Sequence, residues 1–381
     1  MTHDVLILNG CKWIAFIIVL FLSPPILLGL VRKTKARMQG RVGARVTQPL
    51  HDLLKMLKKG ETLSSVTSWI FRSTAVINFA VLLLIAVLTP WLSFKPQIFE
   101  HEVPYYATSR AKSSVLKLNE AKVGQSKDLP VVDGLSVKKD LALSKDAELP
   151  APTSVSFFDV STTGSDIFLI IYMFALARLF TVLAALDAGS VFGGFGASRE
   201  VTLALLVEPA IVLAFASLGC AAHTSDLNLV FSWAANNPIM DLAPLWFIAG
   251  FALFLASLVE LSRMPVDDPT THLELTMVHE AMILENSGRN LALVEFTHVL
   301  KMAVLLGLTG QCFLHGFYAL FKFDHWMVAL FSLLSLGLLS ILIGVIESAT
   351  VKLRWTKIPE FIAYSVAMSL LCVFIAIGVR R

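Results

Sequence analysis

Long apolar runs separated by polar segments dominate the chain of 381 residues. Each run has roughly twenty residues, which is the length that a helix needs to cross about 30 Å of hydrocarbon. The runs lack the two-residue alternation of membrane-barrel strands, so they are predicted to be helices. About eight membrane-spanning helices are expected, at residues 11–31, 70–92, 166–186, 201–221, 242–262, 291–315, 327–350 and 361–378.

The composition agrees with this pattern. The chain is 56% hydrophobic and 15% charged, with a mean hydropathy of +0.73, far from the composition of soluble globular domains. The expected fold is an all-α integral membrane protein, a bundle of about eight transmembrane helices with cytoplasmic amphipathic loop helices. Three parts are expected. They are 1–92, with two membrane helices and a basic loop at 32–69; 93–165, a long polar loop; and 166–381, a six-helix membrane bundle with an acidic loop at 263–290.

Lysine and arginine in the short loops predict the orientation. The loop at 32–69 and the segment 352–357 are rich in them, so both are expected to face the cytoplasm. An even number of spans then places both termini outside. The loop at 93–165 also falls outside, and its polar composition, poor in aromatic residues, predicts an extended or partner-ordered segment.

The two cytoplasmic loops carry opposite charge. From Arg32 to Lys59 there are nine lysines or arginines against a single acid, Asp52, whereas Arg263 to Arg289 holds five acids. In the basic loop, leucines at positions 50, 53, 54 and 57 predict a short amphipathic helix at the membrane surface. Opposite charge allows the loops to close over a shared cavity or to dock a soluble partner. Anchoring of the basic loop to anionic lipid is the alternative.

Charged residues also occur where lipid should exclude them. Arg178 lies near the middle of the third predicted span, Glu208 lies at nearly the same depth in the fourth, and Lys301 is equally deep in the sixth. Each alone costs roughly 2.5–3.5 kcal/mol or more at the bilayer centre, so such residues usually face a bundle interior or mark an ion pathway. We expect Arg178 and Glu208 to pair, with simple bonding between helices as the alternative role.

Three further glutamates, Glu260, Glu295 and Glu347, lie nearer the cytoplasmic ends of their predicted spans, where water would reach them. Interfacial solvation and function are both open for Glu260 and Glu347. Carboxylates at graded depth can relay protons, because burial raises a carboxylate pKa and a neighbouring cation lowers it.

Metal and phosphate sites are not expected in this chain. The four cysteines lie singly in apolar runs without a C-x-x-C pair, which argues against zinc and iron–sulfur sites. His279-Glu280 begins like H-E-x-x-H but has Ile283 at the second histidine position. His272 and His279 are expected to line a wet loop, with metal ligation as the alternative. The glycines at 193–196 predict a tight turn, with Ser198 capping the next helix.

Two loops resemble known families. Residues 37–43 read RMQGRVG, and Gln48-Pro49-Leu50, Asp52 and Lys55 follow; this pattern resembles the first cytoplasmic loop of membrane subunit 1 of complex I, the proton-pumping NADH dehydrogenase. The spacing E-x-x-R-x-P-x-D from Glu260 to Asp267 also fits that superfamily. The runs VDDPTTHLELTMVHEAMILE, at 266–285, and SVFGGFGASREVTLALLVEP, at 190–209, look like the membrane subunit of group 4 membrane-bound [NiFe] hydrogenases, including formate-hydrogenlyase-type complexes.

The chain departs from complex I in places. It has Asp268, Thr270 and His272 where quinone-reducing relatives have a denser acidic run, which disfavours a quinone site, and Ala44 replaces a proline. The resemblance implies an eight-helix subunit of the bacterial or archaeal cytoplasmic membrane. It further implies hydrogenase-like large and small soluble subunits, iron–sulfur proteins and antiporter-like membrane subunits as partners. The [NiFe] centre and iron–sulfur clusters would reside in those partners, no cofactor or metal in this chain, and no nucleic acid is expected.

The resemblance also suggests roles for individual residues. Glu208, with Arg178 tuning its pKa, would be the deep proton relay, and Lys301 would belong to the same pathway. The cytoplasmic entrance would comprise Glu260, Asp267, Asp268, Glu274 and Glu280. The cavity and the contact with the soluble arm would involve Arg37, Gln39, Arg41, Gln48, Asp52, Lys55, Arg263, His272 and His279. A quinone-binding complex I subunit and a purely structural membrane anchor are the alternatives.

Overall fold

The structure is a computed structural model that describes residues 2–62, 67–92, 165–236, 240–267, 277–320 and 325–379. Eight helices in these ranges are long and apolar enough to cross a membrane, so the predicted all-α membrane fold is confirmed. They are α1 (Thr2–Met38), α3 (Trp69–Leu88), α6 (Ile167–Asp187), α7 (Val191–Ala222), α9 (Ala243–Glu260), α11 (Gly288–Leu320), α12 (His325–Ala349) and α13 (Ile358–Val379). The shorter elements are α2 (Gln48–Leu57), α8 (Leu227–Asn236), α10 (His279–Ile283), η1 (Met240–Leu242) and η2 (Trp355–Lys357).

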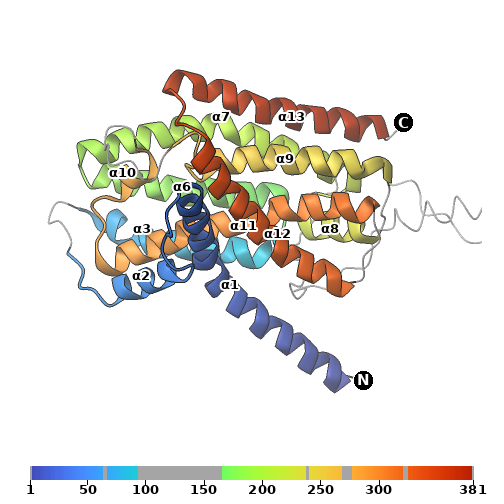
Figure 1. Cartoon of the computed structure of the whole chain (residues 1–381), viewed down its shortest axis with the longest axis horizontal. Helices are drawn as coiled ribbons and strands as arrows, with labels where there is room; N and C mark the ends of the chain where they lie inside the picture. Colours follow the sequence, from blue (N-terminus) through green and yellow to red (C-terminus); the bar gives the residue numbers. More distant parts are fainter. Residues whose placement is uncertain are drawn as a thin grey trace, which may run out of the picture. The chain divides into compact units, whose positions relative to one another are not determined.

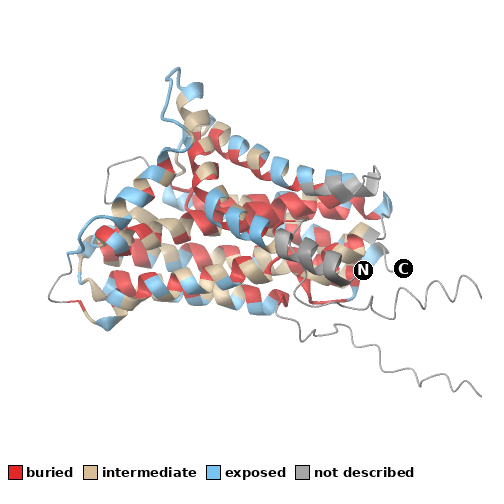
Figure 2. Cartoon of the chain, turned by 90° about the horizontal axis from the view of Figure 1, so that it is seen from below, coloured by how far each residue is buried: buried red, intermediate tan, exposed pale blue. Residues whose placement is uncertain are grey.

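Two helices form the centre of the bundle. The most apolar stretch of α9 is 72% buried and that of α11 is 61% buried, whereas that of α6 is only 22% buried. Helix α9 packs against α7, α11 and α13, and α11 packs against α3 and α12 as well (Figure 1). Figure 2 shows the buried residues concentrated on the inner faces of the helices and the exposed ones on outer faces and loops. An outer helix such as α6 therefore presents most of its surface to lipid or to other proteins.

The fourth span begins earlier than predicted. Helix α7 starts at Val191, and Ser190 caps it by accepting a hydrogen bond from the Gly193 amide at 3.1 Å. The predicted cap at Ser198 is therefore wrong, because Ser198 lies inside the helix. The glycines meet a packing requirement instead of forming a turn: a Cβ on Gly193 would lie 2.8 Å from the Ala185 carbonyl oxygen, and one on Gly196 would lie 2.8 Å from that of Val278.

The amphipathic helix predicted in the basic loop is confirmed as α2, which packs against α1 and α11. Leu53 is buried, while Leu54 and Leu57 remain exposed. The basic and acidic loops meet at one end of the bundle, where the Thr62 amide donates to Ser287 Oγ at 2.9 Å. Residues 93–164 of the predicted external loop lie outside the described residues.

Candidate functional site

Five charged side chains from four helices converge inside the bundle. They are Arg178 on α6, Glu200 and Glu208 on α7, Glu260 on α9 and Lys301 on α11, and we call them the membrane cluster. Arg178 is the central cation: its Nη1 pairs with Glu208 Oε1, its Nη2 pairs with Glu260 Oε1, and its Nε lies 3.9 Å from Glu200 Oε1. The predicted pairing of Arg178 with Glu208 is confirmed.

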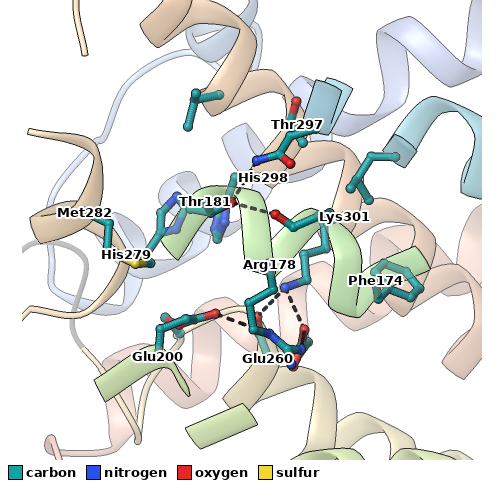
Figure 3. A pocket seen from close by; sticks show the side chains of 15 residues that line it. Phe174, Arg178, Thr181, Glu200, Glu260, His279, Met282, Thr297, His298 and Lys301 are labelled. Atoms are coloured by element: carbon teal, nitrogen blue, oxygen red, sulfur yellow. Dashed lines mark hydrogen bonds and ion pairs between the residues drawn. The ribbon is translucent and has the colours of Figure 1, made fainter. Parts of the chain in front are cut away.

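Glu260 does not lie in the water-accessible position that its predicted depth indicated. Its side chain is only 4% exposed, and Lys301 Nζ lies 2.7 Å from its Oε1. Figure 3 shows Arg178, Glu200, Glu260 and Lys301 pointing toward one another. The predicted division into a deep relay at Glu208 and an entrance at Glu260 is therefore corrected, since both carboxylates bind the same guanidinium.

Local structure explains how these side chains reach each other. Arg178 lies at the middle of α6, whose start is capped by Asp166. At the other end of α6, Asp187 Oδ2 accepts from the Ser68 amide at 2.8 Å and so joins the helix to α3. Because α6 is just long enough to span a bilayer, Arg178 is placed at mid-depth.

Helix α9 ends directly after Glu260. Ser262 adopts a left-handed conformation with φ of 46°, and the Arg263 amide donates back to the Leu258 carbonyl at 2.9 Å. Carbonyl groups in the last turn of a helix have no intrahelical donor. The Glu260 carbonyl instead accepts from Lys301 Nζ at 3.1 Å. Lys301 thus binds both the side chain and the main chain at this helix end.

The membrane cluster holds more acids than bases. Three carboxylates face two cations, Arg178 and Lys301, so the fully ionised cluster carries one surplus negative charge. Most of these groups are shielded from solvent: the side chains of Arg178, Glu200 and Lys301 are 9%, 12% and 15% exposed. A surplus buried charge is unfavourable in a low-dielectric interior. Binding of one proton would neutralise it, which makes the cluster a candidate proton site.

A cavity of about 50 Å³ adjoins the membrane cluster, and Arg178, Glu200, Glu260 and Lys301 form part of its lining. Three buried atoms on its lining residues, Asn78 Oδ1, Arg178 Nε and His279 Nε2, have no hydrogen-bond partner among the described residues. Buried polar atoms are nearly always satisfied by protein or by ordered water. Since a water needs roughly 10–15 Å³ of such space, the cavity has room for a few of them.

Two stacked histidines form another part of the cavity wall. The rings of His279 on α10 and His298 on α11 are 4.0 Å apart between centroids and inclined by 25°. Burial, together with the nearby cations of Lys301 and Arg263, lowers the pKa of His279 to about 3. His279 is therefore neutral at physiological pH. His298 was missed from the sequence, although Glu295, His298 and Lys301 recur every three positions in an otherwise apolar helix.

A second charged group, the loop cluster, consists of Lys35 on α1, Arg263 after α9 and Glu347 on α12. Glu347 Oε1 lies 3.2 Å from Arg263 Nη1, and its Oε2 lies 3.6 Å from Lys35 Nζ. The Glu347 side chain is only 3% exposed, which disfavours interfacial solvation, one of the two roles left open for this carboxylate. Arg263, predicted at the cavity or soluble-arm interface, is buried at 7% exposure and joins three helices.

Two predicted entrance carboxylates, Asp267 and Glu280, lie in the acidic loop between α9 and α11. Asp267 Oδ1 binds Lys352 Nζ at 2.6 Å, and Asp267 Oδ2 accepts from the Val278 amide at 2.8 Å, which fixes the start of α10. Burial, helped by the neighbouring Glu295 and opposed by Arg263, raises the pKa of Glu280 to about 7. A carboxyl group with this pKa changes its protonation state near neutral pH.

Comparison with known proteins places this architecture in a family. The model of the family described as NADH dehydrogenase matches residues 11–116 and 142–377. The chain belongs to the NADH dehydrogenase family. The resemblance to subunit 1 of complex I is thus confirmed.

Two Escherichia coli (strain K12) proteins are similar to this chain. Hydrogenase-4 component C is 28% identical over 78% of this chain and 73% of that protein. Formate hydrogenlyase subunit 4 is 25% identical over 76% of this chain and 72% of that protein. These relatives confirm the resemblance to the hydrogenase branch. Among solved structures, an archaeal respiratory membrane complex, the membrane-bound sulfane sulfur reductase, contains a chain with the same fold. Its TM-score is 0.65 at 13% identity, over 97% of this chain and 99% of that chain.

The residues that first suggested this family in the basic loop lie apart from the cavity. Arg37, Gln39, Arg41, Gln48 and Lys55 are exposed, and Asp52 is half-buried. Gln48 Nε2 donates to Asp52 Oδ1 at 2.9 Å along α2. The structure therefore places these side chains on the surface of the loop and not in the cavity wall. Asp268, His272 and Glu274 lie outside the described residues.

Proposed function

We propose that this chain is the membrane subunit of a group 4 [NiFe]-hydrogenase-type complex and couples redox chemistry in soluble subunits to proton movement. The observation that carries the proposal is the membrane cluster, with three carboxylates bound to two cations among the membrane helices. Buried ionisable residues of this kind usually belong to ion pathways. Relationship to hydrogenase-4 component C and formate hydrogenlyase subunit 4 supports the hydrogenase setting.

In this proposal, the cluster binds and releases a proton when one of its cations changes position. The carboxylates are stabilised as anions only while Arg178 and Lys301 stay within ion-pair distance. A shift of either cation removes that stabilisation and raises the proton affinity of the carboxylates. Redox steps in the soluble subunits would produce such shifts through the cytoplasmic loops, to which α10 and Arg263 belong.

A route from the cytoplasm to the cluster is also part of the proposal. Glu280, with its pKa of about 7, is suited to exchange protons with the cytoplasm, together with Asp268 and Glu274 of the same acidic loop. Asp267 holds α10 in place. From Glu280, protons would pass the stacked His279 and His298 and the waters of the cavity to reach the membrane cluster. Each imidazole can accept a proton at one nitrogen and donate from the other.

Partners supply the remaining chemistry in this proposal. Hydrogenase-like large and small subunits and iron–sulfur proteins would hold the [NiFe] centre and the clusters, and antiporter-like membrane subunits would extend the ion pathway. The exposed basic side chains Arg37, Arg41 and Lys55 would contact an acidic surface of the soluble subunits. The complex would lie in a bacterial or archaeal cytoplasmic membrane, with both termini of this chain outside.

The decisive experiment uses the purified complex in sealed vesicles. Glu260→Gln keeps the shape and hydrogen bonding of the side chain but removes its titratable proton. We expect redox turnover to continue while proton movement per turnover falls to background. The matched control is Glu360→Gln, because Glu360 is 62% exposed and pairs only with Lys357 among the described residues. Normal proton movement in the Glu260 variant would refute the coupling role and favour a purely structural anchor.

A quinone-binding role is the alternative that the family description raises. Pockets for drug-sized ligands usually measure about 300–1,000 Å³, whereas this cavity measures about 50 Å³ and suits water better. If quinone-site ligands inhibit the complex, and if this inhibition is lost in the Glu260 variant, the quinone-binding role would be favoured over a water-filled proton pathway.

A further inference from the structure

One carboxylate of the membrane cluster faces outward from the bundle. The Glu208 side chain is 37% exposed, whereas those of Glu200 and Glu260 are 12% and 4% exposed. Because Glu208 pairs with Arg178 at the middle of α6, it lies near mid-depth of the membrane. Lipid headgroups and soluble proteins do not reach this depth.

The surroundings of Glu208 on α7 are apolar and open. Val201, Leu205 and Glu208 follow the i, i+4, i+7 spacing of one helix face, and Val201 and Leu205 are 50% and 74% exposed. Helix α6, which packs beside α7, is the least buried of the eight spans. Valine and leucine suit a face turned to lipid, but a carboxylate there costs roughly 2.5–3.5 kcal/mol. A neighbouring protein that covers this face would remove that cost.

Charge indicates the chemistry of the neighbour. The membrane cluster carries one carboxylate more than its two cations can balance, and Glu208 is the carboxylate with open surface. A basic side chain from outside would balance the surplus and bind the exposed carboxylate while the cluster holds no proton. In the membrane interior, such a side chain must come from a helix, because a helix satisfies its own backbone hydrogen bonds.

We propose that the face of α7 around Leu205 and Glu208 docks a transmembrane helix of a neighbouring membrane subunit, which places a basic side chain beside Glu208. This inference rests on the proposed function in one respect, namely that the chain works within a complex containing other membrane subunits. Beyond the proposed function, the inference specifies which surface of this chain makes the contact, how deep in the membrane the contact lies, and that the partner's side chain is basic.

Site-specific cross-linking in the assembled complex tests the contact. A photoreactive phenylalanine analogue at position 205 is expected to cross-link to an apolar peptide of another membrane subunit that contains a lysine or arginine. The matched control is the same analogue at Leu338 on α12, which is 63% exposed. Cross-links from position 205 to lipid only, to a second copy of this chain or to a soluble subunit would overturn the proposal, as would capture of the same peptide from both positions.

A charge substitution tests the chemistry of the contact. Leu205→Lys places a cation one helical turn from Glu208 and opposes the proposed basic side chain. We expect the purified complex to retain severalfold less of the cross-linked subunit, while Leu338→Lys retains it normally. Normal retention in both variants would overturn the proposed basic side chain.

The two experiments distinguish failure of the proton role from failure of the docking surface. A position-205 cross-link together with normal coupling in Glu260→Gln would refute the proton role and keep the docking surface. Loss of coupling in Glu260→Gln without the cross-link would do the reverse.

Discussion

The membrane cluster and the loop cluster are both buried networks of ion pairs, but their charge balance is opposite. The membrane cluster has three carboxylates and two cations, whereas in the loop cluster Arg263 and Lys35 share the single carboxylate of Glu347. A surplus of acid favours proton binding, because a proton can neutralise it. A surplus of cation offers no such site, since arginine does not lose its proton in proteins.

The positions of the two clusters fit this difference. The loop cluster joins the ends of α1 and α12 to the segment after α9, and Met302 Sδ on α11 lies 3.8 Å from Arg263 Nη2. It holds the ends of these helices together. The membrane cluster lies on the cavity and includes the outward-facing Glu208. Similar residue types therefore hold helices together in the loop cluster and, by our proposal, transfer protons in the membrane cluster.

The largest expected effect comes from removing the central cation. Arg178→Ala leaves three carboxylates, of which Glu200 and Glu260 are largely shielded from solvent, with Lys301 alone, and loss of one partner from a buried ion pair typically costs about 3–5 kcal/mol. We expect a marked fall in the yield and thermal midpoint of the purified complex. Arg263→Ala should be milder, because Lys35 still lies beside Glu347. Arg178→Lys, which keeps the charge, is the matched control. Equal losses of yield and thermal midpoint from the two alanine variants would show that Arg178 stabilises the protein no more than Arg263 does.

A second comparison separates coupling from fixation. Glu208→Gln is expected to leave assembly intact but to abolish proton movement per redox turnover, since an amide cannot exchange the proton. Glu347→Gln removes the carboxylate that pairs with both Arg263 and Lys35 and should lower the thermal midpoint while proton movement per turnover stays normal. Both quantities can be measured on one preparation in sealed vesicles. If Glu347→Gln also uncouples an intact complex, the two clusters belong to one pathway and the distinction drawn above is wrong.

The sequence predicted the fold and one ion pair because both depend on position along the membrane normal. Apolar length gave the eight spans, and equal depth in neighbouring spans gave the pairing of Arg178 with Glu208. Depth alone does not give the rotation of a helix about its axis. The exposure of Glu208 and the burial of Glu347 both depend on that rotation, and neither was predicted.

Helix ends account for the other errors. Glu200 was overlooked because the fourth span was predicted to begin at residue 201, whereas α7 begins at Val191 and carries Glu200 into the cluster. Glu260 was assigned to water because it ends an apolar run. The packing of α9 at the centre of the bundle buries that end. Tertiary packing of this kind leaves no local signal in the sequence.

The smallest expected effect concerns Glu280, which lies near Arg263 of the loop cluster. Its pKa is raised to about 7 from an ordinary value of 4.5, chiefly by burial. Its contribution to stability is therefore fully present below pH 4.5 and is lost as the pH rises through 7, because the unfolded chain ionises first. The thermal midpoint of the complex relative to that of Glu280→Gln should thus decline between pH 5 and pH 8. Glu285→Gln, an exposed position nearby, is the matched control and should leave the pH profile of the native complex unchanged. A constant difference between the native complex and Glu280→Gln across this range would show that Glu280 is already ionised in the folded protein, and that it is not the group that exchanges protons at the cytoplasmic entrance.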